Sequence, residues 1–299
     1  MSAPISPETS HRAGGAGGVL SHRFAGVVVA GSVNDLVVLG VRSDDEDHRA
    51  GDALLLRLRP GRADVVANVP WPARAVSALG DGRYLVVDAA DSLQVVDGHT
   101  APVLLRSGVR ALRDGVVLAH DGGVFRVAVL DGAVVLLPRG CVSGGCVLGA
   151  STASTILVGA SDGSVVEFDD AGHERWRAAP DDASVDGAAV DAVALVDGVV
   201  AIAAGRCLQV GPRRYALKQP ASSVARFHDR WYVGSTTGGL LVVDDDDDEV
   251  RSLRPSLRAH QLVVAIDGLV VVSDLFVATS TDGDDFSSRD LSALVRLAR

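Results

Sequence analysis

The sequence is poor in several features that would point to particular classes of protein. Aromatic residues make up only 4% of the 299 residues, lysine occurs once, at Lys218, and there are three cysteines. No apolar run reaches the roughly 18 to 20 uncharged residues that a membrane-spanning helix needs. Asp and Glu number 38 against 28 Lys and Arg, so the net charge is −10. This balance argues against a protein that binds nucleic acid through a basic surface, and we expect no membrane partner.

The cysteines argue against a disulfide framework. Cys141 and Cys146 are close enough in sequence to pair across a turn, but Cys207 would be left over. The spacing of the first two supplies at most half of a zinc site, and no pair of histidines lies nearby. We therefore expect small buried thiols, with no metal and no cofactor.

One stretch, residues 155–176, contains the pattern from which the rest of the chain is built. The apolar run Ile156 to Ala160 meets a turn signal at residues 161–163, and alternating residues follow from Ser164 to Asp169. A second turn at Ala171-Gly172 precedes Arg175 and Trp176. The pattern predicts three consecutive strands joined by tight turns.

The same pattern occurs seven times along the chain. Each unit has an inner strand rich in Ala, Gly and Ser, then a second strand that is almost uninterrupted apolar sequence, as a strand covered on both faces requires. Seven units in 299 residues give about 43 residues each, within the ~40 to 45 of a four-stranded blade. We predict an all-β fold: a single β-propeller of seven four-stranded antiparallel blades. Six or eight blades are alternatives, and two β-sandwiches would show less regular turns. The predicted units begin at Phe24, Val76, Val109, Gly145, Asp191, Val224 and Leu262.

The two ends of the chain are assigned on weaker patterns. Residues 1–18 are rich in Ser, Pro, Gly and Ala and lack the features of a secretory signal, so we predict a disordered leader, with the propeller domain at 19–299 and a cytoplasmic location. Residues 288–298 fit either the last outer strand or a short helix capped by Ser288. In the helical case, residues 19–23 would complete the seventh blade.

Two units carry residues of a known repeat. In the fourth unit these are Val158 to Gly163, Asp169, Gly172 and Trp176, and in the sixth they are Tyr232 to Ser235 and Leu241 to Asp244. They resemble the repeat of the quinoprotein-like (PQQ-like)/WD40-like propeller superfamily. The resemblance implies that Trp176 docks one blade on the next, a place that Trp71 and Trp231 do not share. Because the quinone-dependent enzymes of that family are larger, eight-bladed and exported, the resemblance implies the fold and gives little support to an oxidoreductase.

The last unit contains Ser280-Thr-Asp-Gly-Asp-Asp-Phe286, which resembles a degenerate Asp-box of the sialidase type. That element stabilises a turn and is not catalytic. A sialidase also needs an arginine cluster and a Tyr/Glu nucleophile pair, whereas Tyr84, Tyr215 and Tyr232 all lie inside strand runs. The resemblance therefore implies a turn and no sialidase activity.

One rim of the predicted disc carries the turns between second and third strands and the links between blades, and propellers usually bind at this rim. The longest turn is predicted at 42–49, and the links are predicted at 68–72, 181–186 and 254–260. Trp71, between two prolines, is the strongest candidate, because a rigid exposed aromatic anchors an interface well. The alternative is that Trp71 packs on a neighbouring blade. The predicted partner-binding residues are Trp71, Asp44, Asp45, Glu46, Asp47, Asp181, Asp182, Arg254 and Arg258.

Other polar residues do not assemble into a catalytic pattern. Asp244 to Asp248 and Glu249 suggest a solvated acidic turn, with a basic partner or calcium as alternatives. His120 could face the channel, but a lone histidine at a turn is more often structural. There is no Ser, His and Asp constellation and no phosphate loop, so we predict that the protein is not an enzyme.

These observations favour a non-enzymatic scaffold that presents rim loops to one or more proteins within a multi-protein bacterial system. We expect the chain to be monomeric by itself. The alternative, from another class, is a small-ligand binder or an enzyme of hydrolase or quinoprotein type that uses the axial channel. Convergent Arg, His or Asp side chains at the channel would favour that alternative.

Overall fold

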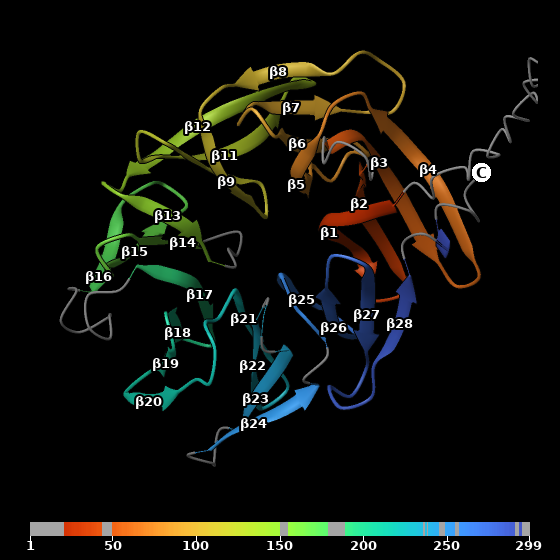
Figure 1. The fold of residues 1–299 in the computed structure, drawn as a ribbon. Coiled ribbons are helices and arrows are strands. Elements are labelled where there is room, and N and C mark those ends of the chain that lie inside the picture. Colours follow the sequence, from red (N-terminus) through yellow and green to blue (C-terminus); the bar gives the residue numbers. More distant parts are fainter. Residues whose placement is uncertain are drawn as a thin grey trace, which may run out of the picture.

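The strands surround a central axis in a ring of small sheets (Figure 1). The computed structural model describes residues 21–43, 50–149, 155–178, 189–235, 237, 239–244, 249–254, 257–290 and 293–294. Within these residues, 28 strands form seven four-stranded antiparallel sheets, each with its strands in chain order. The fold is a seven-bladed β-propeller, as predicted. The predicted leader at 1–18 lies outside the described residues.

The inner strands begin within three residues of their predicted starts. The first blade consists of β1 (Ser21–Ser32), β2 (Asp35–Ser43), β3 (Ala50–Arg59) and β4 (Arg62–Val69). The second consists of β5 (Ala73–Ala78), β6 (Tyr84–Asp88), β7 (Leu93–Val96) and β8 (Val103–Arg106). The third consists of β9 (Val109–Arg113), β10 (Val116–Ala119), β11 (Gly123–Leu130) and β12 (Ala133–Cys141). The fourth consists of β13 (Gly145–Leu148), β14 (Thr155–Ala160), β15 (Val165–Asp169) and β16 (Glu174–Ala178).

The remaining blades follow the same plan. The fifth consists of β17 (Val190–Val196), β18 (Val199–Ala204), β19 (Cys207–Val210) and β20 (Arg213–Ala216). The sixth consists of β21 (Ser223–Phe227), β22 (Arg230–Ser235), β23 (Gly239–Asp244) and β24 (Val250–Arg254). The seventh consists of β25 (Gln261–Ala265), β26 (Gly268–Val272), β27 (Phe276–Ser280) and β28 (Ser287–Asp290).

Asp-Gly pairs make several of the tightest turns. Asp114-Gly115, Asp131-Gly132 and Asp197-Gly198 each place both residues at positive φ, between 48° and 81°. A two-residue hairpin of this type matches the right-handed twist of the strands that it joins, and Asp-Gly is among its favoured sequences. These pairs therefore explain why the chain reverses after only two residues between β9 and β10, β11 and β12, and β17 and β18.

Apolar side chains fill every junction between neighbouring blades. Seven buried clusters are present, and each combines residues from two adjacent blades. The second strands are the most deeply buried, and every residue of β10, β14 and β26 is buried. Stacking of blade on blade thus supplies the two-sided cover that the apolar second strands need.

Ring closure follows the first of the two predicted alternatives, in which the end of the chain supplies the last outer strand. Ser288 lies in β28, which completes the seventh blade, and residues 21–23 pair with β2 in the first blade and not with the seventh. The helical residues Ala293 and Leu294 come after this strand, and Asp290, not Ser288, accepts a hydrogen bond from the backbone N–H of Ala293. The first and seventh blades therefore share no strand among the described residues.

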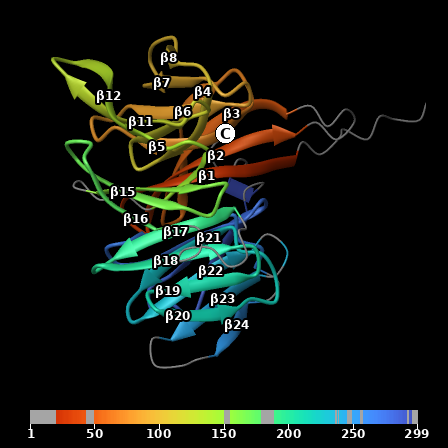
Figure 2. The ribbon, with the colours of Figure 1, turned by 90° about the vertical axis from the view of Figure 1, so that its left-hand side faces the viewer.

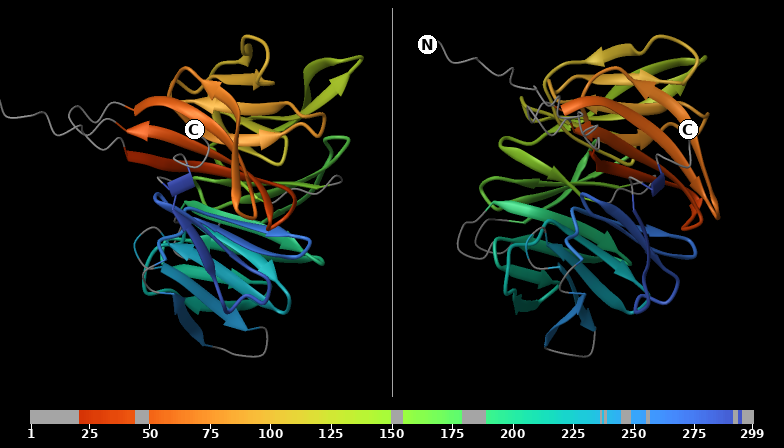
Figure 3. Two further views of the ribbon diagram at one scale, coloured as in Figure 1. Left: turned by 90° about the vertical axis from the view of Figure 1, so that its right-hand side faces the viewer. Right: turned by 45° about the vertical axis from the view of Figure 1, so that its right-hand side comes forward.

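The closing seam is held by packing and by one backbone contact. Leu294 joins Val33, Leu36 and apolar residues of the seventh blade in one buried cluster. The short helical segment near the C-terminus lies between the first blade and the seventh (Figure 3). The backbone N–H of Val33 donates to Oδ1 of Asp267 at 2.8 Å. These contacts stabilise the ring where a shared strand is absent.

Candidate functional site

The predicted partner-binding residues are spread over several links, and part of them lie outside the described residues. The residues outside the described ranges are Asp44, Asp45, Glu46, Asp47, Asp181 and Asp182. Arg254 and Arg258 are exposed near the link between the sixth and seventh blades, and Arg254 lies 3.6 Å from Asp285. Trp71 lies at the link between the first and second blades, two blades further round the ring. The structure thus does not bring Trp71 together with the two arginines.

Trp71 is half-buried. Its ring packs against the cluster between the first and second blades, which includes Val69 and Tyr84. The indole Nε1 is buried, and no hydrogen-bond acceptor among the described residues reaches it. Trp71 therefore packs at the junction between two blades, as in the alternative drawn from the sequence, and remains partly exposed.

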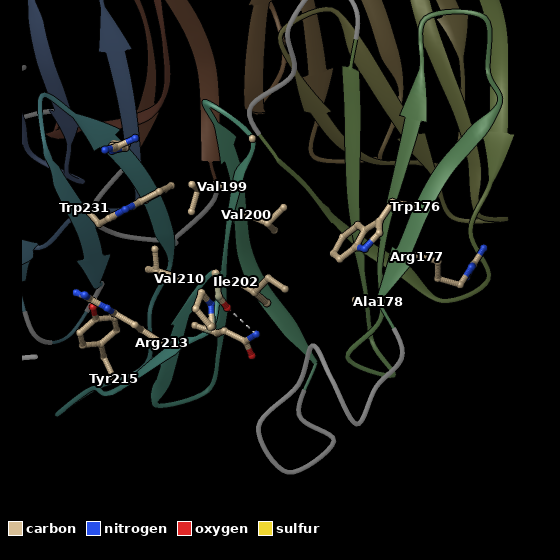
Figure 4. Close-up of a pocket in the computed structure, with 15 residues that line it drawn as sticks. Trp176, Arg177, Ala178, Val199, Val200, Ile202, Val210, Arg213, Tyr215 and Trp231 are labelled. Atoms are coloured by element: carbon tan, nitrogen blue, oxygen red, sulfur yellow. Dashed lines mark hydrogen bonds between the residues drawn. The ribbon is translucent and has the colours of Figure 1, made fainter. Parts of the chain in front are cut away.

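A groove of about 700 Å³ lies on the other rim of the disc (Figure 4). In each blade the turn between first and second strands and the turn between third and fourth strands share this rim, which faces away from the links (Figure 2). The lining includes the two turns of the fifth blade at this rim, at Gly198 and at Gly211-Pro212. It also includes residues of the fourth and sixth blades on either side, so the groove crosses the end of the fifth blade.

The floor of the groove comes from side chains of β18 and β19. Ile202 of β18 pairs with Gln209 of β19, and both line the groove with Val200. Gln209 donates from Nε2 to the carbonyl of Gly211 at 3.0 Å, while its Oε1 is buried without a donor among the described residues. The face of the fifth blade that meets the fourth blade therefore changes from apolar at Ile202 to polar at Gln209, which lies farther from the axis.

Trp176 of β16 forms the wall on the side of the fourth blade. Its ring points toward Val200 and Ile202, whereas Arg177 points away from the groove (Figure 4). Trp176 remains 39% exposed. The Arg177 guanidinium binds both carboxylate oxygens of Glu174, at 2.9 and 2.7 Å, and this pairing raises the pKa of Arg177.

Trp231 of β22 and Arg226 of β21 form the wall on the side of the sixth blade. Trp231 is only 1% exposed and belongs to the buried cluster between the fifth and sixth blades, together with Tyr215. The Arg226 guanidinium lies 5.8 Å from the centre of the Trp231 ring, a cation–π arrangement. Arg226 also forms an ion pair with Asp197 at 3.4 Å.

The two tryptophans correct an expectation. Trp176 was expected to dock one blade on the next, but its ring is partly exposed in the groove. Trp231, which was expected not to occupy such a place, is the tryptophan packed between two blades. The groove itself was missed because its residues come from three blades and meet only when the ring has closed.

A second feature lies on the innermost strands. One-residue bulges interrupt their pairing at Arg74 in β5, Arg110 in β9, Cys146 in β13 and Asp191 in β17. A bulge leaves a residue out of the ladder and redirects its side chain. Four consecutive blades thus present a redirected residue near the start of the inner strand, around the axis on the rim that carries the links.

These bulge residues form a polar neighbourhood. Arg74 contacts Asp91 at 2.7 Å and donates to the carbonyls of Val109 and Arg110 in the next blade. His120 also contacts Asp91, at 2.8 Å, and the hydrogen bonds from His120 and Arg74 lower the pKa of Asp91. Burial raises the pKa of the Cys146 thiol, so this cysteine favours the protonated form.

Exposed apolar side chains gather on the outer face of the second and third blades. Val103 and Leu104 of β8 are 57% and 58% exposed, and Leu130 at the tip of β11 is 52% exposed. The β11–β12 hairpin projects from the disc beside β8 (Figures 1 and 2). Nothing in the structure indicates what covers this face.

Two acidic motifs of the sequence have structural roles. Oδ1 of Asp282 accepts hydrogen bonds from the Ser280 hydroxyl and from the backbone N–H groups of Asp284 and Asp285, each at 2.9 Å. The Asp-box-like segment therefore stabilises the β27–β28 turn. Asp244 forms ion pairs with Arg230 and Arg251, and residues 245–248 of the acidic turn lie outside the described residues.

The structure also bears on metals, disulfides and membranes. In the described ranges, no group of three or more His, Cys, Asp or Glu side chains is placed to hold a metal ion. Cys141, Cys146 and Cys207 form no disulfide, and Cys141 is exposed. No helix in the described part of the chain is long and apolar enough to cross a membrane.

The fold is a seven-bladed β-propeller, and comparison with solved structures agrees. Sqt1 from Saccharomyces cerevisiae matches with a TM-score of 0.64 and 13% identity, over 90% of this chain and 85% of that chain. The computationally designed Ika8 protein matches with a TM-score of 0.50 and 14% identity, over 90% and 96%. In all, 928 chains match, and identities this low show the fold alone. No protein-family model and no curated protein matches the sequence.

Proposed function

We propose that the protein is a protein-binding propeller and that the groove across the fifth blade is its main contact site. The observation that carries this proposal is the partly exposed ring of Trp176 in an open groove that also contains Tyr215, Trp231, Arg213 and Arg226. Trp, Tyr and Arg are the residue types that most often dominate the energy of protein interfaces. A half-exposed tryptophan also leaves apolar surface in water that a partner would cover.

The finer parts of the proposal rest on the sequence. We propose a non-enzymatic scaffold of the bacterial cytoplasm that works within a multi-protein system and is monomeric by itself. The acidic composition supports a protein partner over a nucleic acid. The likeness of two repeats to quinoprotein-like propellers remains a prediction about ancestry, and no step of the proposed function depends on it.

Capture of partners from the source cell tests this function. The tagged chain is compared with Trp176→Ala, with Trp71→Ala for the predicted rim, and with Leu104→Ala as a control that removes a more exposed apolar side chain. We expect stoichiometric partners that Trp176→Ala loses and Leu104→Ala retains. If Trp71→Ala alone loses them, the predicted rim is the contact site. If no protein is captured, the scaffold function is wrong.

A second candidate function is a small-ligand site at the channel mouth, which the bulge residues favour. Arg110 supplies a guanidinium group with no carboxylate of the described residues within ion-pair distance, whereas Arg74 is already paired with Asp91. A guanidinium such as that of Arg110 suits a carboxylate or phosphate ligand. Thermal unfolding in the presence of a library of small anions tests this, with Arg110→Gln as the matched variant. A shift in Tm that Arg110→Gln removes supports the site, and the absence of any shift contradicts it.

A further inference from the structure

We propose that the groove binds an extended acidic segment of a partner protein, with one apolar side chain of that segment inserted against Trp176 and its carboxylates paired with Arg213 and Arg226. The inference rests on the proposed function and specifies the chemistry of the partner.

The apolar part of this site lies between the fourth and fifth blades. The ring of Trp176 faces Val200 and Ile202 across the groove (Figure 4). On the fifth blade, Gln209 pairs with Ile202 and lies beside it on the side away from the axis. No large apolar side chain of that blade therefore covers Trp176. An aliphatic or aromatic side chain of a partner would remove this apolar surface from water, which is the main driving force for such insertion.

The charged part of the site lies at the other end of the groove. Arg213 follows Pro212 at the start of β20, and Arg226 lies beside Trp231. The lining itself contains no Asp or Glu, but Arg213 and Arg226 both have contacts within the chain, that of Arg226 being with Asp197 at the edge of the groove. A guanidinium presents a rigid fork that fits a carboxylate through two hydrogen bonds, so this end favours acidic side chains.

One acidic neighbour of the groove sharpens the inference. Asp197 contacts Arg226 at 3.4 Å, and its side chain is 82% exposed. A partner carboxylate would compete with Asp197 for this arginine. Replacement of Asp197 by Asn removes the competing charge and retains a residue that this turn accepts, because Asn-Gly and Asp-Gly both suit a hairpin with two residues at positive φ.

The shape of the groove favours an extended chain. The groove runs from Trp176, over the turns at Gly198 and Gly211, to Trp231. A Cβ on Gly198 would meet no atom within 4 Å, so the surface above this turn is open to an approaching backbone. An extended peptide can cross the turns and place its side chains at both ends of the groove.

Single-stranded nucleic acid is the competing occupant, because tryptophan and arginine also stack on bases. The observations favour a peptide. A phosphate backbone is attracted by a broad basic surface, whereas this chain has ten more acidic than basic residues.

The test uses a phage-displayed library of random dodecapeptides, selected on the immobilised full-length protein. Parallel selections use Trp176→Ala and Leu104→Ala. We expect an enriched motif that joins Asp or Glu to an aliphatic or aromatic residue, present on the wild type and Leu104→Ala and absent on Trp176→Ala. A basic or neutral motif, a motif that Trp176→Ala retains, or no enrichment at all would each overturn the inference.

Affinity of the best peptide then tests each contact. Trp176→Ala should weaken binding by about 30-fold or more, as for an interface hot spot, whereas Trp176→Phe should retain most of it. Arg213→Gln should weaken binding about tenfold, and Asp197→Asn should strengthen it severalfold. Unchanged affinity in Arg213→Gln and Asp197→Asn would contradict the charge pairing. Stronger binding of a single-stranded oligonucleotide than of the peptide would favour the competing occupant.

Failure of this inference is distinguishable from failure of the proposed function. If partners captured from the cell depend on Trp176 while the selected peptides are not acidic, the propeller still binds proteins and only the partner chemistry is wrong. If no partner is captured, the function itself fails.

Discussion

The fifth blade lies between two tryptophans, one from the fourth blade and one from the sixth, and these tryptophans have opposite surroundings. Trp231, on the side of the sixth blade, is 1% exposed, whereas Trp176, on the side of the fourth blade, is 39% exposed. The fifth blade itself explains the contrast. Its face toward the sixth blade presents Leu208, Val210 and Tyr215, which belong to one buried cluster with Trp231.

The other face of the same strands ends in different residues. Gln209 follows Ile202 outward along the row that faces the fourth blade. Blades diverge from the axis, so large apolar residues are needed near the outer edge if neighbours are to stay in contact. The comparison teaches that alternate residues of one short strand decide whether a junction between blades becomes core or groove.

The largest expected effect is on the packed side. Trp231→Ala should lower the free energy of unfolding by about 3 to 5 kcal/mol, because it leaves a large cavity in the cluster between the fifth and sixth blades. Urea denaturation followed by circular dichroism measures this loss. Trp231→Phe, which keeps most of the apolar volume, should lose much less. A loss below about 1 kcal/mol for the alanine variant would show that the packed side is not packed as described.

The second-largest effect on stability is expected when an apolar side chain fills the groove between the fourth and fifth blades. Gln209→Leu should raise the free energy of unfolding by up to about 1 kcal/mol, because it extends the apolar row toward Trp176 and removes a buried oxygen without a donor. Acrylamide quenching of tryptophan fluorescence should fall at the same time. Gln209→Glu, which is close in size but charged, should show neither change. If Gln209→Leu leaves quenching as it was, the side chain does not face Trp176.

A smaller effect on stability, confined to acidic pH, is expected for Asp282 in the β27–β28 turn of the seventh blade. The hydrogen bonds that Asp282 accepts from the backbone lower its pKa from 3.8 to about 2 in the folded protein. A lowered carboxyl pKa adds stability above the unfolded value and loses it as the pH falls from about 4 toward 2. Asp282→Asn keeps the acceptor but should make the fall in denaturation midpoint between pH 5 and pH 2.5 less steep. An equally steep fall in both proteins would contradict this account.

The smallest effect on stability is expected for Trp176→Ala. Because the ring is partly exposed and lies over a groove, its removal should change the free energy of unfolding by less than about 1 kcal/mol. Urea denaturation beside Trp231→Ala measures the difference between the two sides directly. A loss as large as that of Trp231→Ala would mean that Trp176 is a core residue.

Much of the fold could be predicted because its signals are local. Apolar second strands and Asp-Gly turns such as Asp197-Gly198 follow one another in sequence, and they were sufficient to place seven blades. The end of the chain was harder, because residues 288–298 fit two structures, and pairing with Ala278 and Thr279 decides that β28 completes the seventh blade.

The groove could not be predicted because its residues are far apart in sequence. Trp176, Gln209 and Trp231 belong to three blades, and their burial depends on which face of each strand meets a neighbour. A shift of one residue in a strand exchanges its two faces, so the sequence pattern alone does not settle which tryptophan is buried. Here the register of β18 with β19 pairs Ile202 with Gln209, which places Gln209 and not Val210 on the face toward the fourth blade.

The most direct test of the central claim is the capture of partners from the source cell by the wild type and by Trp176→Ala, with the free energy of unfolding measured on the same preparations. The account predicts that Trp176→Ala loses its partners while its stability stays within about 1 kcal/mol of the wild type. Partners that Trp176→Ala retains in full would contradict the claim that the open side of the fifth blade is the contact site.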